Sequence, residues 1–403
     1  MANSDTSRPP YEPRLATRTA GLRPSLYARL LRRLESYAGE VYPFHIGESW
    51  LLPDPSVKRA LAELDEHSVH RYGHPQGLPV LRELIADQLT HAGPAVSADN
   101  VVVTHGATHG LHLACQALLD PGDEVLVLSP HWPLINGMIT AASAIPVEVP
   151  FTCRLRNEAL APISIDDLIR PYLSSRTKAV YVTSPNNPDG VVLDERELAQ
   201  LARVCVDHNL LALVDEAYDR FCFHHRPPPL TAFPGMEERA GRLFRLPKSH
   251  RLAGLRVGFA SAPVPICDAM VRLANLSVYN VSLLVQRAAL AALADGEESV
   301  QVSCAAAENG HRVLLDALHG IDGLVFRPAQ GGAYLFVDLA AFLKGRTCAE
   351  LLDEAVTRGV LFAPGVGFGS AYQSHARLCF TSMPPERMVR GVQRFKELLH
   401  HLA

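Results

Sequence analysis

The chain has 403 residues, of which 48% are hydrophobic and 20% charged, and its 38 Lys and Arg against 42 Asp and Glu give a formal net charge of -4. This is the composition of a globular protein, long enough for roughly two to three domains, and it excludes a disordered or fibrous chain. The sequence has neither the concentrated basic face that binds nucleic acid nor an apolar run of the roughly 20 residues that cross a membrane. We therefore expect a cytoplasmic protein with neither kind of partner.

The eight cysteines are far apart and form no C-x-x-C pair. Zinc sites and disulfide frameworks have characteristic short spacings, which this sequence lacks. We therefore expect the cysteines to be small buried side chains in a reducing compartment, and we expect no bound metal.

The first hundred residues predict an arm followed by short elements. Residues 1–23 contain three prolines among polar side chains and predict a flexible arm. Further on, apolar residues at helical spacing predict helices, and a short apolar run predicts a strand. The predicted helices lie at 25–34, 55–65 and 78–91, and the strand lies at 44–46.

Short apolar strands then alternate with helical segments. The strands are predicted at 101–103, 124–128, 179–182 and 210–214, with a helix at 111–119. Near-continuous apolar strands between helices predict an α/β fold, with a mostly parallel central sheet covered by helices on both faces.

The C-terminal part predicts a smaller α+β domain. Helical spacing continues at 265–294, 300–318 and 385–399, and apolar runs at 332–337 and 376–380 predict strands. We expect four parts: the arm at 1–23, a segment at 24–70 that contributes to the small domain, a large domain at 71–295 and the small domain at 296–403.

Open α/β sheets bind ligands beyond the carboxyl ends of their strands, so the turns there are the candidate sites. The first such turn holds Gly106, Ala107 and Thr108 directly before a helix. Free backbone N–H groups and the positive end of a helix suit an anion such as phosphate. The same residues could form only a capped helix start, with Thr108 at or near the cap.

Three further turns carry side chains that suit a flat ligand. Trp132, one of two tryptophans, could stack on a planar group or belong to the core. Asn187 lies between two X-Pro turns, where its amide either binds a ligand or only completes the turn. Asp215 ends an otherwise apolar strand, so it needs a cation opposite it, unless it is a helix cap or part of a scaffold ion pair.

Lys248 and Arg256 lie in the last of these turns. A lysine that faces a pocket can have its pKa lowered by burial and attack a carbonyl, although most lysines face solvent. Arg256 adds a charged fork suited to phosphate. One cofactor, pyridoxal 5'-phosphate, fits the groups found on these successive turns. They are a phosphate cradle, an aromatic plate, an amide, an acid, Tyr218, a lysine and an arginine.

With these residues the chain resembles a fold type I pyridoxal-phosphate enzyme of the aspartate aminotransferase superfamily, in its class I/II branch. The resemblance runs from about Phe44 to the C-terminus, about 360 of the 403 residues. The residues that carry it are Tyr72, Lys248 and the segments 47–48, 77–82, 187–190, 215–218, 252–258, 364–369 and 377–380.

This resemblance implies the roles of the cofactor site. Lys248 would join the cofactor's aldehyde as an aldimine and move protons at the substrate α-carbon by way of a quinonoid intermediate. Asp215 would keep the pyridine nitrogen protonated, which makes the ring an electron sink. Trp132 would stack on the ring, Tyr218 and Asn187 would bond its phenolic oxygen, and Gly106, Ala107, Thr108 and Arg256 would hold the phosphate.

The resemblance also implies the substrate side and the assembly. Arg377 would clamp the α-carboxylate of the small-molecule substrate, an amino acid or a similar compound, with Asn187 and the backbone of Gly47 nearby. Tyr72 in this family reaches the phosphate of the other subunit. A homodimer with shared active sites is therefore expected.

Two features depart from the family pattern. Arg245 and Pro247 stand where the family often has hydroxyl residues before the lysine, so Arg245 either replaces a hydroxyl contact with a charged one or points away. Several histidines lie near the candidate turns, and each is either a satisfied or exposed imidazole or part of a proton donor or specificity element. They are His45, His74, His105, His109 and His131.

The leading hypothesis is an aminotransferase that labilises the Cα–H bond of an amino acid and passes its amino group to a 2-oxo acid. The alternative keeps the cofactor but leads to β-elimination, cyclisation or O2-dependent decarboxylation, as in relatives from specialised metabolism. A third possibility, the effector-binding module of a transcription regulator, is disfavoured because the roughly 40 residues before the resemblance contain no helix-turn-helix pattern. The substrate side chain is not predicted.

Overall fold

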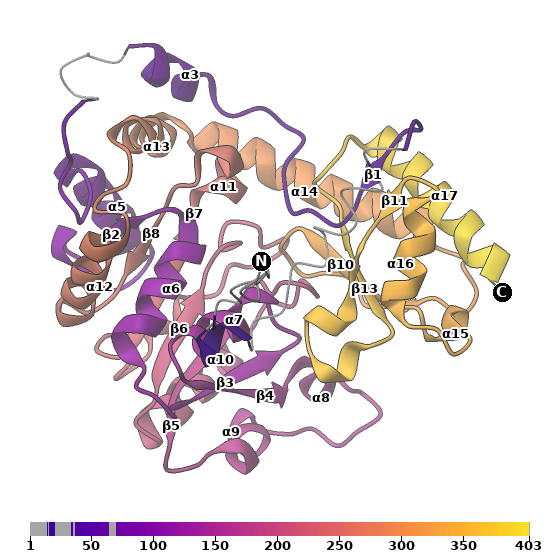
Figure 1. Cartoon of the computed structure of the whole chain (residues 1–403), viewed down its shortest axis with the longest axis horizontal. Coiled ribbons are helices and arrows are strands. Elements are labelled where there is room, and N and C mark those ends of the chain that lie inside the picture. The colour runs from indigo at the N-terminus through magenta and orange to yellow at the C-terminus, as the bar shows by residue number, and fades with distance from the viewer. Residues whose placement is uncertain (1–13, 15, 21–33, 35–36, 64–69, 403) are drawn as a thin grey trace, which may run out of the picture.

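The computed structural model describes residues 14, 16–20, 34, 37–63 and 70–402. Apart from Leu34, the helix predicted at 25–34 lies outside the described residues, as does most of the arm predicted at 1–23. Within the arm, the structure has one helical turn, α1 (Thr17–Ala20). Figure 1 shows two layered bodies, with the central sheet in the magenta part of the chain and the second body in the orange and yellow part.

The central sheet has seven strands in the order β2-β8-β7-β6-β5-β3-β4. Strands β7, β6, β5, β3 and β4 pair in parallel, and β8 runs antiparallel to both of its neighbours. The predicted mostly parallel sheet is therefore confirmed. The strands are β2 (Val101–Thr104), β3 (Glu124–Ser129), β4 (Ile145–Pro150), β5 (Thr177–Thr183), β6 (Leu211–Asp215), β7 (Ala240–Arg245) and β8 (Gly258–Ser261).

Helices cover both faces of this sheet because successive side chains of a strand point to opposite faces. Leu126 and Val180 pack on one face with residues of α9 (Ile165–Ile169) and α10 (Glu195–Asp207). Val127 and Tyr181, one residue further along each strand, pack on the other face with α6 (Gly106–Leu118), α7 (Leu134–Ala141) and α12 (Val264–Ser277). The near-continuous apolar strands follow from this double burial.

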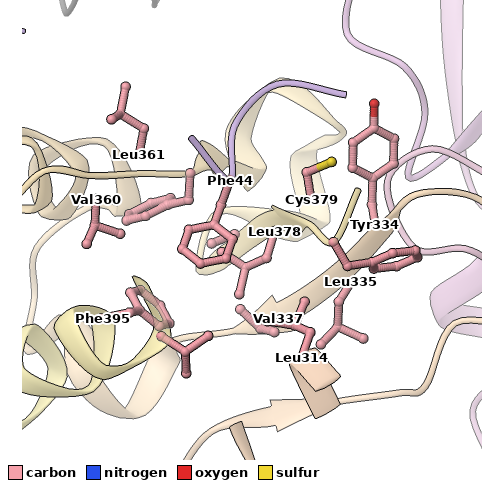
Figure 2. Packing of buried hydrophobic residues seen from close by; sticks show 14 of the residues in the cluster. Phe44, Leu314, Tyr334, Leu335, Val337, Val360, Leu361, Leu378, Cys379 and Phe395 are labelled. Atoms are coloured by element: carbon pink, nitrogen blue, oxygen red, sulfur yellow. The ribbon is translucent and has the colours of Figure 1, made fainter. Parts of the chain in front are cut away.

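The second body is the smaller α+β unit expected from the sequence. Its four-stranded sheet has the order β12-β13-β10-β9, and a two-stranded sheet pairs β1 with β11 in parallel. Figure 2 shows Phe44, Val337, Leu378 and Phe395 meeting in its core. The elements are β1 (Tyr42–Pro43), α14 (Glu297–Leu318), β9 (Val325–Phe326), β10 (Tyr334–Asp338), α15 (Ala340–Leu343), α16 (Cys348–Val356), β11 (Val360–Leu361), β12 (Ala363–Pro364), β13 (His375–Cys379) and α17 (Pro385–Leu402).

Several predicted boundaries differ from the structure. The helix predicted at 265–294 is two helices, α12 and α13 (Leu283–Asp295), and the segment between them contains Tyr279 at a φ of 62°, outside helical geometry. The strand predicted at 44–46 is a turn, and the nearest strand, β1, ends just before it at Pro43. The helix predicted at 111–119 already begins at Gly106. The remaining helices are α3 (Pro55–Ala62), α5 (Pro79–Ala92), α8 (Thr152–Leu155) and α11 (Leu246–Ser249).

Strand β7 escaped prediction because two arginines interrupt its apolar pattern. Arg242 is nevertheless 2% exposed, since its Nε and Nη2 donate to the two carboxylate oxygens of Glu216 over 2.8 and 2.7 Å. This bidentate pair satisfies both buried charges and ties the turn after β6 to β7. The four-part division of the chain stays a prediction. Along the described stretches, no helix is both long and apolar enough to cross a bilayer.

Candidate functional site

The candidate site lies where the chain leaves the carboxyl ends of β2, β5, β6 and β7 and meets the second body. A cavity of about 130 Å³ opens there, between the start of α6, the turn around Lys248 and the segment after β1. It brings together six predicted site residues from distant parts of the chain: Gly47, Gly106, Ala107, Thr108, Lys248 and Arg256. Its lining consists of Ile46, Gly47, Glu48, Gly106, Ala107, Thr108, Lys248, Ala253 and Arg256.

The phosphate side of the cavity is the first turn of α6. The helix begins at Gly106, which has a φ of +75°, so Thr108 lies inside the first turn and not at the cap. A Cβ added to Gly106 would lie 3.4 Å from Nη2 of Arg256, in a backbone conformation that strains any side chain. Burial and then the positive charge of Arg256 lower the pKa of His105. Backbone N–H groups, a helix N-terminus and a guanidinium therefore face one anion-sized space.

Asp215 is held at the end of β6 by two donors. It is 2% exposed, its Oδ1 accepts from the backbone N–H of Ala217 over 3.1 Å, and its Oδ2 accepts from the hydroxyl of Tyr181 over 3.2 Å. The hydroxyl of Thr183 donates in turn to the Tyr181 oxygen over 3.1 Å. These two hydrogen bonds fix the carboxylate in position at the strand end. The sequence predicted Asp215 at this place but not the groups that donate to it.

Lys248 lies in α11, directly after β7. Its Nζ donates to the backbone carbonyl oxygen of Gly47 and lies 5.8 Å from the ring centroid of Tyr218. Gly47 belongs to the segment after β1, 201 residues earlier in the chain. The amine therefore sits at the junction of the central sheet and the second body, in the same cavity as the anion-sized space.

Tyr218 meets the second body through Tyr334. The two hydroxyl oxygens are 2.7 Å apart, and the rings pack edge to face with centroids 5.6 Å apart. Both side chains are almost fully buried. Tyr334 also restricts the neighbouring segment, because a Cβ on Gly47 would lie 1.7 Å from its hydroxyl oxygen.

Arg377 is oriented by polar and aromatic neighbours. Its Nη1 donates to Oδ1 of Asn187 over 2.8 Å, and its Nη2 donates to the carbonyl oxygen of His45 over 2.6 Å. Its guanidinium carbon lies 4.0 Å from the ring centroid of Tyr334 and 5.1 Å from that of Phe368. Arg377 is 7% exposed, so its charge is buried against two ring faces, as cation–π contacts require.

Six predicted site residues do not line this cavity. Four of them, Asn187, Asp215, Tyr218 and Arg377, make the contacts described above, and the other two are Trp132 and Tyr72. Trp132 is half-buried between β3 and α7 and packs on the cluster that contains Ala107. Tyr72 is 86% exposed, and its ring centroid lies 5.0 Å from that of Tyr279. The side chains of Arg245 and Pro247 lie outside the described part of the structure.

The five histidines separate into two groups. His45 and His105 adjoin the site, and burial followed by the charge of Arg377 lowers the pKa of His45 to about 4, so that its imidazole is neutral at pH 7. The other three contact their own segments: His74 accepts from Gln76, His109 accepts from the backbone of His105, and His131 contacts the Trp132 carbonyl and Asn136.

Sequence reasoning missed Tyr181, Tyr334 and Phe368. The alternation of side chains along a strand contained a signal for Tyr181. Thr183 of β5 pairs with Asp215 of β6, and Tyr181 lies two residues before Thr183, so it points to the same face of the sheet. The same holds for Tyr334, which lies two residues before Phe336, the partner of Arg377 in β10 and β13. These pairings depend on a register that the single sequence did not provide.

Comparisons with known proteins agree with this architecture. A family model described as aminotransferase class I and II matches residues 40–395. The aspartate aminotransferase of Geobacillus stearothermophilus is 31% identical over 402 residues, which cover 95% of this chain and 99% of that protein. The arginine–pyruvate transaminase of Pseudomonas aeruginosa is 30% identical over 381 residues, which cover 94% and 93%. The solved aspartate aminotransferase of Thermus thermophilus with maleate has a TM-score of 0.87 at 27% identity and covers 96% of this chain and 100% of its own.

Proposed function

Because it belongs to the class I and II aminotransferase family, this chain is an aminotransferase, and we propose that it works with pyridoxal 5'-phosphate bound between Lys248 and Asp215. The family depends on this cofactor. The observation that carries the proposal is one cavity that joins the Lys248 amine to the start of α6 and to Arg256. An aldehyde that also bears a phosphate needs that combination of an amine and an anion site.

The residues fit the cofactor chemically at each of its groups. When bound, the cofactor supplies a ring that accepts negative charge from the substrate α-carbon and carries the amino group between substrates. Lys248 provides the amine for its aldehyde, and the first turn of α6 with Arg256 provides the cradle for its phosphate. Asp215 provides the anion for its ring nitrogen, already oriented by the Tyr181 hydroxyl and the Ala217 N–H.

The protein's own groups then divide the work at the substrate. Arg377 binds the α-carboxylate through a fork that Asn187 and the His45 carbonyl hold in place. With the cofactor bound, the Lys248 amine would take and return the proton at the substrate α-carbon. Asp215 would keep the proton on the ring nitrogen, and Tyr218 and Asn187 would donate to the phenolic oxygen. Burial of Asp215 and Arg377 keeps water from weakening these electrostatic contacts.

The relatives include proteins named for aspartate, prephenate and arginine, which supports an amino acid as the amino donor. Single turnover with the purified cofactor-loaded enzyme tests the reaction class. Transamination predicts one equivalent of 2-oxo acid per site and an amino group left on the cofactor. Release of ammonia or CO2, or uptake of O2, would contradict transamination and favour elimination or decarboxylation.

We also propose a homodimer in which Tyr72 completes the site of the partner subunit. Tyr72 and Leu276 are each 86% exposed, and Tyr72 packs against Tyr279, which is itself 43% exposed. A second copy would cover this apolar surface. Mixing Tyr72→Ala chains with Lys248→Ala chains tests sharing, because each mixed dimer has one site with both residues intact. Activity should reappear on mixing, and an inactive mixture would contradict the shared site.

The cytoplasmic location likewise stays a prediction, which cell fractionation would test.

A further inference from the structure

Tyr334 is the residue through which the two halves of the site touch. It lies on β10 in the second body and is 3% exposed. Figure 2 shows its side chain pointing away from Leu335 and Leu314, which pack in the core. The Tyr334 hydroxyl therefore leaves the apolar core and reaches toward the central sheet, where it meets the Tyr218 hydroxyl at 2.7 Å.

The same ring supports the carboxylate-binding arginine. The guanidinium carbon of Arg377 lies 4.0 Å from the Tyr334 ring centroid, a cation–π distance. One side chain thus contacts the phenol on the cofactor side with its hydroxyl and the guanidinium on the substrate side with its ring. These two contacts use different atoms, so they can be separated by substitution.

The direction of the hydrogen bond between the two tyrosines follows from counting protons. Each hydroxyl has one proton to donate. If Tyr218 gives its proton to the phenolic oxygen of the cofactor, its own oxygen can only accept from Tyr334. A hydroxyl that accepts a hydrogen bond becomes a stronger donor, because hydrogen bonds in a chain polarise one another.

We propose that Tyr334 is a positioning residue that orients the Tyr218 phenol and strengthens its hydrogen bond to the cofactor's phenolic oxygen. This inference rests on the proposed function. A stronger donor at Tyr218 favours the deprotonated form of the cofactor's phenolic oxygen. Tyr334 should therefore lower the pH midpoint at which the bound cofactor changes its visible absorption. Loss of the Tyr334 hydroxyl should raise that midpoint, on the order of 0.5 pH unit, since part of one neutral hydrogen bond is at stake.

The test uses the cofactor-loaded enzyme without substrate. Absorption spectra across pH are recorded for the wild type, for Tyr334→Phe and for the control Tyr42→Phe. Tyr42 is a matched control because it is 5% exposed in the same core cluster, while its hydroxyl bonds Glu40 over 2.8 Å and not a site residue. Both variants lose one tyrosine hydroxyl, and melting temperatures measured alongside report any general loss of stability.

A double variant isolates the route of the effect. In a Tyr218→Phe background there is no phenol to orient, so adding Tyr334→Phe should move the midpoint no further. Steady-state kinetics give a second readout: Tyr334→Phe keeps the ring beside Arg377 and should leave KM nearly unchanged, whereas Tyr334→Leu loses the ring and should raise KM.

The outcomes separate this inference from the proposed function. An upward shift in Tyr334→Phe, absent in Tyr42→Phe and abolished in the Tyr218→Phe background, supports it. An unchanged midpoint, or an equal shift that persists without the Tyr218 hydroxyl, overturns it while leaving the proposed function standing. A wild-type protein that takes up no cofactor absorption would overturn the proposed function, and this inference with it.

Discussion

The hydroxyl of Tyr181 lies 3.2 Å from Oδ2 of Asp215, although the two residues belong to different strands of the central sheet. A hydrogen bond to a charged group contributes about 1.5 to 3 kcal/mol. We therefore expect Tyr181→Phe to raise the dissociation constant for pyridoxal 5'-phosphate on the order of 10-fold, because Asp215 would lose one of the donors that hold its carboxylate in position. Equilibrium dialysis measures the change.

The control for this prediction is Thr183→Val. Thr183 donates to the Tyr181 oxygen and not to the carboxylate, so its loss removes only a neutral hydrogen bond. Its effect on cofactor affinity should be clearly smaller. Equal affinities for the wild type and Tyr181→Phe would show that Tyr181 does not support Asp215.

Arg377→Lys should impair substrate binding far more than folding. A lysine cannot reproduce the planar fork that bonds Asn187 and the His45 carbonyl while it faces a carboxylate. We expect KM for the amino acid to rise on the order of 100-fold, the equivalent of one or two charge-assisted hydrogen bonds. Arg82→Lys is the matched control, since Arg82 is 8% exposed, donates to the Ala98 carbonyl and pairs with Asp99, and none of these residues belongs to the candidate site. A KM that rises equally in both variants would contradict the assignment.

Gly47→Ala should displace Tyr334. The added Cβ would lie 1.7 Å from the Tyr334 hydroxyl oxygen, which is far inside contact distance. We expect overpacking to cost about 1 to 3 kcal/mol of stability and to lower activity by moving the segment that accepts the Lys248 hydrogen bond. Gly254→Ala meets no atom within 4 Å and should change neither. Melting temperature and kcat/KM measure both effects, and a fully stable and active Gly47→Ala enzyme would refute the close packing.

The stability of the protein should fall in acid partly because of His311. Burial, and then the charge of His224, lowers the pKa of His311 to about 4. Its Nε2 accepts from the Ala329 N–H over 3.0 Å, between the rings of Phe223 and Phe380. The unfolded chain binds a proton near pH 6.5 and the folded chain does so only near pH 4, so the free energy of unfolding falls as the pH drops through that window.

Denaturant titrations at several pH values test this contribution. His311→Gln removes the buried imidazole, so the slope of unfolding free energy against pH between 6.5 and 4 should flatten by up to about 1.4 kcal/mol per pH unit. His319→Gln is the control, because His319 follows the same helix and is exposed. Parallel slopes for the wild type and His311→Gln would contradict the prediction.

The sequence predicted those site residues whose place follows from the order of strands and turns along the chain. Lys248, Asp215 and Asn187 follow strands whose carboxyl ends lie along one edge of a sheet, so position in the chain already indicated their neighbourhood. β7 was missed because burial of Arg242 becomes intelligible only with Glu216 opposite it. The predicted site residues left out Ile46, Glu48 and Ala253, which also line the cavity. Ile46 and Ala253 carry no distinctive chemistry.

The contacts that the sequence did not predict join segments far apart in the chain. Arg377 and His45 are separated by 332 residues, and Tyr334 and Tyr218 by 116. The register of β10 against β13 and the docking of the second body on the central sheet decide these pairs. No local sequence pattern encodes this register or this docking. A single sequence therefore indicates which residues belong to the site but not which of them contact each other.

The most direct measurement is the site at which the cofactor attaches. The protein is incubated with pyridoxal 5'-phosphate, reduced with borohydride to fix any covalent link, digested and analysed by peptide mass spectrometry. We expect one modified residue per chain, Lys248, and none at the lysines at 58, 178, 344 and 396. Modification elsewhere with Lys248 unlabelled, or no modification at all, would contradict this expectation.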